Sequence, residues 1–91
     1  MKKEEAIRQG LALVNRSTIA MVGTVDDERY PNIRAMIKME NERLKQIWFS
    51  INTSSKKVTQ LKKSPKACVY FVDFDKWERL MLVGIIMFQT L

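Results

Sequence analysis

The chain has 91 residues with 46% hydrophobic and 29% charged residues, which is the composition of a folded globular protein and excludes a disordered tail. The length allows one domain with a modest core, so we predict a single domain over residues 1–91. The single cysteine excludes an internal disulfide, and the absence of a recognisable leader predicts a cytoplasmic protein. The longest apolar run, residues 80–88, is too short to cross a membrane as a helix, which takes about 20 residues.

The net charge of +6 is concentrated in one part of the chain. Between positions 43 and 66 the sequence has seven basic residues and no acidic one: Arg43, Lys45, Lys56, Lys57, Lys62, Lys63 and Lys66. A localised positive charge fits a phosphate-bearing ligand, nucleic acid or an acidic protein surface as a partner. It also fits a solvated helix face with no partner, and the charge alone leaves these alternatives open.

Hydrophobic periodicity predicts an amphipathic helix, a set of strands and a second, shorter helix. The first helix is expected over residues 3–15. The short helix is expected after Ser54 or Ser55 as its N-cap, and to end at Ser64 before Pro65. The expected strands are residues 18–25, 32–39, 46–51, 66–72 and 79–88.

Two of these strands alternate in a way that separates their side chains into two faces. In the strand over 32–39, Arg34 and Lys38 project the same way, opposite the apolar series Ile33, Ala35, Ile37 and Met39. In the strand over 46–51, Trp48 and Ser50 lie opposite the other apolar series, Ile47, Phe49 and Ile51.

The order of elements is typical of an antiparallel sheet that curls toward a small barrel, so the expected fold class is mainly β with flanking helices. The segment 80–88 is apolar on both faces and therefore needs cover on both sides. We expect this cover to come from a second subunit, or the chain to be cut short.

The residue types present exclude several kinds of chemistry. The sequence contains no histidine, which removes the commonest general base and the commonest metal ligand. The carboxylates lie in expected turns and helix ends, without a spacing that indicates acid–base catalysis or a metal site, so we expect no metal. Cys68 lies within an expected strand, where a small buried side chain is the usual interpretation, and it receives no role.

The segment Thr53-Ser54-Ser55-Lys56-Lys57 combines the features of a phosphate-binding turn. A helix N-terminus offers unpaired N–H groups and a positive dipole end, and this one adds hydroxyls and two cations. The preceding strand carries Ser50, Asn52 and Trp48, whose ring could support a planar heterocycle. Arg34 and Lys38 could reach the same site if the two strands pair. The alternative is that Ser54 only caps the helix and the lysines are solvated.

Four motifs follow one another in an order that resembles a known family: residues 32–36, 47–50, 53–61 and 64–67. Together they are similar to the FMN-binding split barrel of pyridoxamine 5'-phosphate oxidase-like proteins, and most similar to the general stress protein branch. The resemblance covers the chain from the first helix to Gly84. The family domain continues beyond this point, so the resemblance implies a barrel that is incomplete at the C-terminus.

The resemblance implies a homodimer with FMN at the subunit interface, and possible oxidoreductase activity on an unknown small substrate. It assigns the FMN phosphate to Arg34, Ser55, Lys56 and Lys57. It assigns the flavin ring and the ribityl chain to the backbone around Ala35, Met36, Ser50 and Ile51. It also assigns a polar flavin contact to Arg79.

Two alternatives remain open from the sequence. One is a small basic β-barrel that binds single-stranded nucleic acid through residues 43–66, with Trp48 or Tyr70 stacking on bases. The other is a protein that folds and dimerises but binds no ligand. A flavin titration distinguishes the FMN-binding interpretation from both of these alternatives.

Overall fold

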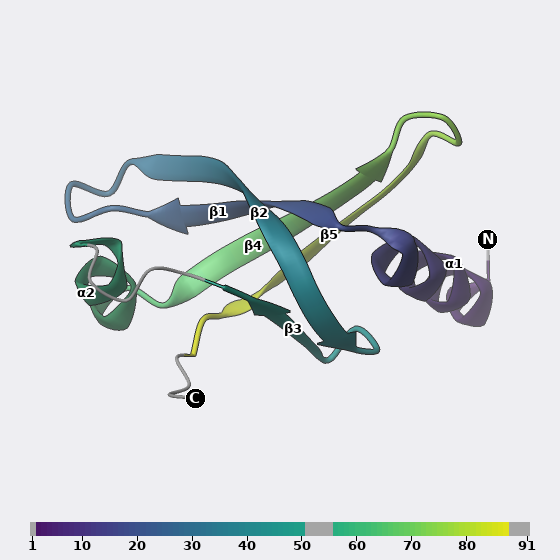
Figure 1. Ribbon diagram of the computed structural model, residues 1–91, viewed down its shortest axis with the longest axis horizontal. Coiled ribbons are helices and arrows are strands. Elements are labelled where there is room, and N and C mark those ends of the chain that lie inside the picture. The colour runs from purple at the N-terminus through teal and green to yellow at the C-terminus, as the bar shows by residue number, and fades with distance from the viewer. Residues whose placement is uncertain (1, 51–55, 88–91) are drawn as a thin grey trace.

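A computed structural model describes residues 2–50 and 56–87, without the side chains of residues 56, 57 and 60. The elements are α1 (Lys3–Arg16), β1 (Ile19–Val25), β2 (Pro31–Glu42), β3 (Gln46–Phe49), α2 (Lys56–Lys63), β4 (Lys66–Asp73) and β5 (Glu78–Ile85), shown in Figure 1. This confirms the expected class, mainly β with flanking helices. None of the helices within the two described ranges is long and apolar enough to span a membrane.

The strands form one antiparallel sheet in the order β3-β2-β1-β4-β5. Three of the four pairings, β1 with β2, β2 with β3 and β4 with β5, join strands that are consecutive in the sequence. The sheet curls into a half-barrel, and Figure 1 shows β2 and β3 running at a steep angle to β4 and β5. A register shift between Lys38 and Glu40 leaves Met39 as an extra residue on β2, and such a bulge increases the local twist.

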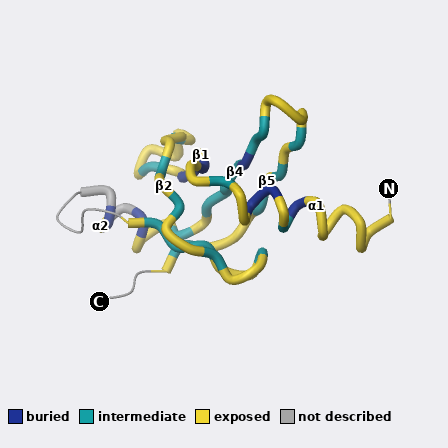
Figure 2. Tube along the Cα trace, turned by 45° about the vertical axis from the view of Figure 1, so that its right-hand side comes forward, coloured by how far each residue is buried: buried dark blue, intermediate teal, exposed yellow. Residues whose placement is uncertain are grey.

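The C-terminal half of α1 supplies one side of the core. Glu4 and Glu5 lie in its first turn and Arg16 in its last, in agreement with the helix dipole. Leu13 and Val14 are almost completely buried against Ala20 of β1 and Phe71 of β4. Partly buried side chains surround this cluster: Leu44, Ile47, Phe49, Val69 and Leu80. In Figure 2 the N-terminal half of α1 is exposed, and its buried positions occur only in the half nearer the sheet.

The sheet has an inner face toward this core and an outer face that no described element covers. Two cross-strand rows on the outer face follow from the registers of the four strands. They are Ala35–Met21–Tyr70–Met81 and Ile33–Gly23–Cys68–Val83. We call these two rows, with Ile19 and Ile37 beside them, the outer apolar face. Ile33 is 71% exposed and Val83 is 78% exposed.

Some sequence-based details differ from the structure. The strand predicted over residues 32–39 extends to Glu42, because Asn41 and Glu42 still pair with Ile47 and Gln46. The last predicted strand ends at Ile85 and not at residue 88. Cys68 is only half-buried, because it lies on the uncovered outer face. The predicted N-cap at Ser54 or Ser55 lies outside the described residues.

Candidate functional site

Arg34 is held on the inner face of β2, in the part of the strand near its start. It lies opposite Val22, which is buried, so the backbone of Arg34 is fixed by the central part of the sheet. Its side chain is exposed, and among the described residues it makes no hydrogen bond or ion pair. A guanidinium carries a permanent charge and presents its donors in a fork that matches phosphate oxygens. Arg34 is therefore available to bind an anion.

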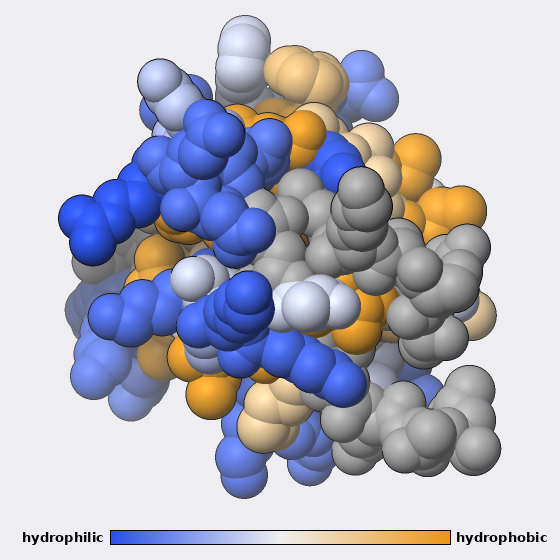
Figure 3. All heavy atoms as spheres, turned by 90° about the vertical axis from the view of Figure 1, so that its left-hand side faces the viewer, coloured by the Kyte–Doolittle hydropathy of each residue, from blue (hydrophilic) through white to orange (hydrophobic). Residues whose placement is uncertain are grey.

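Helix α2 lies at the end of the sheet where β1 ends and β2 begins (Figure 1). Val58 and Leu61 are buried, with the i, i+3 spacing that turns one face of a short helix toward the protein. Lys62 and Lys63 are exposed in its last turn. The helix begins at Lys56, so its unpaired N–H groups lie at the C-terminal end of the predicted phosphate-binding segment, residues 53–57. Figure 3 shows that this end of the molecule presents mostly hydrophilic side chains.

The pairing of β2 with β3 links Arg34 to this region. Phe49 lies opposite Lys38, and the chain leaves β3 at the exposed Ser50, in the direction of the Met36 and Arg34 end of β2. In this register Ser50 directly follows the pair Lys38 and Phe49, and on the neighbouring strand β2 Met36 lies two residues and Arg34 four residues before Lys38. Ala35 lies between Arg34 and Met36, but on the outer face. Ile51 and Ser55 fall outside the described residues, and of Lys56 and Lys57 only the backbone, the first turn of α2, is described.

Lys38 does not belong to this site, and the expectation that it reaches the same site as Arg34 is wrong. Its Nζ donates hydrogen bonds to the carbonyl oxygen of Val14 and, at 2.7 Å, to Oδ1 of Asn41. Desolvation by burial lowers the pKa of Lys38. The ammonium is used to hold the C-terminal end of α1, whose carbonyls carry a partial negative charge.

Two other predicted residues lie away from Arg34 within the chain. Ile47 and Phe49 pack against the core, so Trp48 between them faces the other side of the sheet from Arg34. Arg79 lies on β5 opposite Val72, with β1 and β4 between it and β2. Three strand spacings of about 4.8 Å amount to about 14 Å across the sheet. One chain alone therefore does not bring Arg79 to Arg34.

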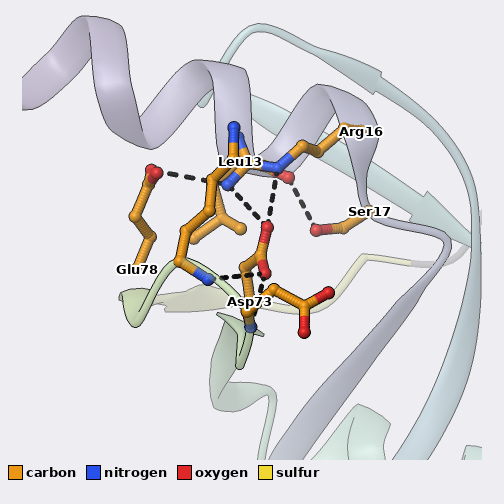
Figure 4. A network of polar contacts seen from close by, with 7 residues as sticks. Leu13, Arg16, Ser17, Asp73 and Glu78 are labelled. Atoms are coloured by element: carbon orange, nitrogen blue, oxygen red, sulfur yellow. Dashed lines mark hydrogen bonds and ion pairs between the residues drawn. The ribbon is translucent and has the colours of Figure 1, made fainter.

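A polar cluster that the sequence did not indicate joins α1 to the β4–β5 hairpin (Figure 4). Arg16 donates from Nε and Nη2 to Oδ2 of Asp73, at 3.2 and 3.0 Å, and its Nη2 lies 3.4 Å from Oε2 of Glu78. The backbone N–H of Lys76, then the Arg16 side chain and the N–H of Asp75, hold the pKa of Asp73 below its usual value.

This cluster borders an open hollow of about 530 Å³ between the end of α1 and the hairpin. Its charges satisfy one another, so it acts as a clasp between two elements and not as a ligand site. The acidic turn after β4 was the only signal in the sequence, because Arg16 and Asp73 are 57 residues apart.

The sequence profile of the family described as pyridoxamine 5'-phosphate oxidase matches residues 4–88. The chain belongs to this family. This confirms the resemblance deduced from the motifs. A comparison with curated proteins gave no match.

Solved structures agree with the family. A Clostridium acetobutylicum protein is described as related to general stress protein 26 of B. subtilis, in the pyridoxinephosphate oxidase family. It is similar at 45% identity and a TM-score of 0.83, over 92% of this chain and 59% of that chain. The present chain thus spans less than two thirds of that relative.

More distant structures share the fold. A pyridoxamine 5'-phosphate oxidase-related, FMN binding protein from Nostoc punctiforme has 22% identity and a TM-score of 0.68, over 90% of this chain and 42% of that one. An F420 reductase has 20% identity and a TM-score of 0.71, over 84% of this chain and 60% of that one.

Proposed function

We propose that the protein is a flavoprotein that binds FMN at the end of the sheet where β2 begins. The observation that carries the proposal is the exposed guanidinium of Arg34, which has no partner among the described residues and belongs to β2, the strand that pairs with β3. The match to an FMN binding family member from Nostoc punctiforme supports the choice of flavin.

The residues present fit the groups of FMN. The phosphate needs cations and N–H donors, which Arg34, the first turn of α2 and the side chains of Ser55, Lys56 and Lys57 can supply. In the proposed site, the backbone around Ala35, Met36, Ser50 and Ile51 lines the ring and the ribityl chain. Bound FMN would supply electron-transfer chemistry, and the protein's part would be to position it and set its electrostatic surroundings.

The proposal includes a homodimer with the flavin at the subunit interface. The outer apolar face crosses four strands, and none of the described elements covers it. Contiguous exposed apolar surfaces of this kind mark interaction sites. Arg79 borders this face, opposite Val72. Because β1 and β4 separate it from Arg34 of its own chain, in the proposal it contacts the flavin as Arg79 of the partner subunit.

The activity we propose is that of a cytoplasmic oxidoreductase acting on a small substrate. The lack of histidine is compatible with this, because a flavin and not a protein side chain would carry the redox step. The lone, half-buried Cys68 agrees with a reducing compartment.

The test is FMN binding by the purified protein and by an Arg34→Gln variant, followed through the absorbance and fluorescence of the flavin. Hydrogen bonds to charged groups contribute about 1.5–3 kcal/mol, so we expect the variant to bind FMN about 10 to 100 times more weakly. Arg8→Gln on the exposed face of α1 is the matched control and should bind as tightly as the native protein. Replacing both Lys56 and Lys57 by alanine should abolish FMN binding.

Native protein that neither contains nor binds FMN would refute the proposal. If the Arg34→Gln and Arg8→Gln variants bind FMN with equal affinity, Arg34 does not bind the FMN phosphate. The nucleic-acid alternative has no comparable support: Tyr70 lies in the middle of the outer apolar face, away from the basic end at α2, so these groups do not form one groove.

A further inference from the structure

Thr24 of β1 is the only buried polar residue among those whose side chains the structure describes, with 8% of its surface exposed. The alternation of β1 places its side chain on the inner face of the sheet, together with those of Ala20 and Val22. Within residues 2–50 and 56–87, no group forms a hydrogen bond with its hydroxyl. Burying a hydroxyl without a partner is unfavourable, because its hydrogen bonds to water are lost and not replaced.

The polar side chain closest in register, Asn32, is already used by the β1–β2 turn. Asn32 lies directly opposite Thr24 on β2, so the two side chains are on the same face. Its Nδ2 donates to Oδ2 of Asp26 at 3.2 Å and to the carbonyl oxygen of Tyr30 at 3.0 Å. An amide nitrogen has two N–H groups, and both are therefore used. Asn32 is held toward the turn and leaves the hydroxyl of Thr24 unpaired.

Arg34 is the diagonal neighbour of Thr24 on the same face. It pairs with Val22, two residues along the ladder from the pair Thr24 and Asn32. Diagonal neighbours in an antiparallel pair lie about 7–8 Å apart. A guanidinium has N–H donors and no acceptor, and a hydroxyl also has a donor to offer. An anion held by Arg34 can therefore accept a hydrogen bond from Thr24 as well.

The first turn of α2 adds further donors without acceptors at the same end of the sheet (Figure 1). The unpaired N–H groups of a helix N-terminus carry a partial positive charge. A helix N-terminus alone would not define a ligand site. Here the buried hydroxyl of Thr24 is an independent observation, because it lacks a partner in the flavin-free chain and belongs to a different strand.

We propose that the hydroxyl of Thr24 donates a hydrogen bond to a phosphate oxygen of bound FMN, beside the guanidinium of Arg34. This inference rests on the proposed flavin site and adds to it a positioning residue from β1, a strand outside the motifs that resemble the family. The hydroxyl has no partner in the flavin-free protein and gains one in the complex. It therefore destabilises the flavin-free fold and strengthens the binding of FMN.

The experiment measures two quantities in the native protein and in Thr24→Val, which replaces the hydroxyl by a methyl group of similar size. The affinities for FMN and for riboflavin, which has no phosphate, are followed by flavin fluorescence, and Tm of the flavin-free protein by circular dichroism. A hydrogen bond to a charged group is lost, so we expect FMN to bind about ten times more weakly. Riboflavin should bind as before. Tm should rise by about 5 °C, because an unpaired buried hydroxyl is removed.

Three further variants serve as controls. Thr24→Ser keeps the hydroxyl and should keep the native affinity for FMN. Thr18→Val, at an exposed position between α1 and β1, should change neither quantity. If Thr24→Val fails to fold, Thr24→Ala removes the same hydroxyl and should show the same loss of preference for FMN over riboflavin.

The outcomes separate this inference from the proposed function. A native protein that binds no FMN overturns both. If Arg34→Gln weakens FMN binding and Thr24→Val does not, the flavin site stands and the role of Thr24 is refuted. An equal loss of affinity for FMN and riboflavin also refutes it, since Thr24 would then not act on the phosphate. So does a lower Tm of Thr24→Val, which would show that the hydroxyl stabilises the fold without flavin.

Discussion

Replacement of Lys38 by methionine tests whether this lysine acts as a structural tie. In the folded protein its ammonium joins β2 to the last turn of α1 through the carbonyl of Val14, and to the hairpin through Oδ1 of Asn41. Methionine keeps most of the aliphatic stem, so the packing is largely retained while the two hydrogen bonds are lost.

The expected loss of stability depends on which hydrogen bonds the Val14 carbonyl and Asn41 still make in the variant. A hydrogen bond to a charged group contributes about 1.5–3 kcal/mol. The Val14 carbonyl still accepts the N–H of Ser17 at 3.2 Å, and half-buried Asn41 can turn to water. The burial that lowers the pKa of Lys38 also offsets part of the gain. We therefore expect Lys38→Met to reduce the free energy of unfolding by about 2 kcal/mol, and Tm by about 10 °C.

The measurement is urea unfolding followed by tryptophan fluorescence and circular dichroism. Lys45→Met is the matched control, since the Lys45 side chain is exposed and makes no hydrogen bond or ion pair with the described residues. If the free energies of unfolding of the two variants agree to within about 0.5 kcal/mol, which is the usual range for surface substitutions, the hydrogen bonds of Lys38 do not stabilise the fold. The Lys38→Met variant should bind FMN with native affinity under conditions where it is folded. A loss equal to that of Arg34→Gln would place Lys38 in the site after all.

Two further predictions concern the sheet and the clasp. A Cβ on Gly23 would lie 2.8 Å from Sγ of Cys68, so Gly23→Ala should destabilise the protein by about 1–2 kcal/mol. Adding Cys68→Ala should recover most of that loss in a double-mutant cycle of urea unfolding, and equal losses with and without Cys68 would contradict the contact. Because the folded-state pKa of Asp73 is lowered, the stability that it contributes is present above its unfolded pKa of about 3.9 and disappears as the pH falls through the folded value. Asp73→Asn should therefore lose less stability than the native protein when the pH falls below about 4, and parallel pH profiles would argue against the clasp.

Local patterns in the sequence were sufficient to predict the helices and strands and to identify the family. The apolar spacing along α1, the alternation along β2 and the pair Ser64-Pro65 after α2 depend on neighbours within one or two turns, so these elements could be predicted with small errors at their ends. The same ordered motifs identified the family that residues 4–88 match. The bulge at Met39 and the extension of β2 to Glu42 escaped prediction, because they depend on the pairing with β3.

The sequence by itself determined that Arg34 and Lys38 share a face of β2 opposite Ile33 and Ile37. Only the tertiary structure decided which face is buried, because alternation separates two faces but does not tell which one the other strands and α1 cover. The result is that Ile33 and Ile37 are exposed and that Lys38 bonds to a carbonyl 24 residues away. Arg34 keeps its side chain exposed on the same strand because α1 ends beside Lys38 and does not reach as far as Arg34.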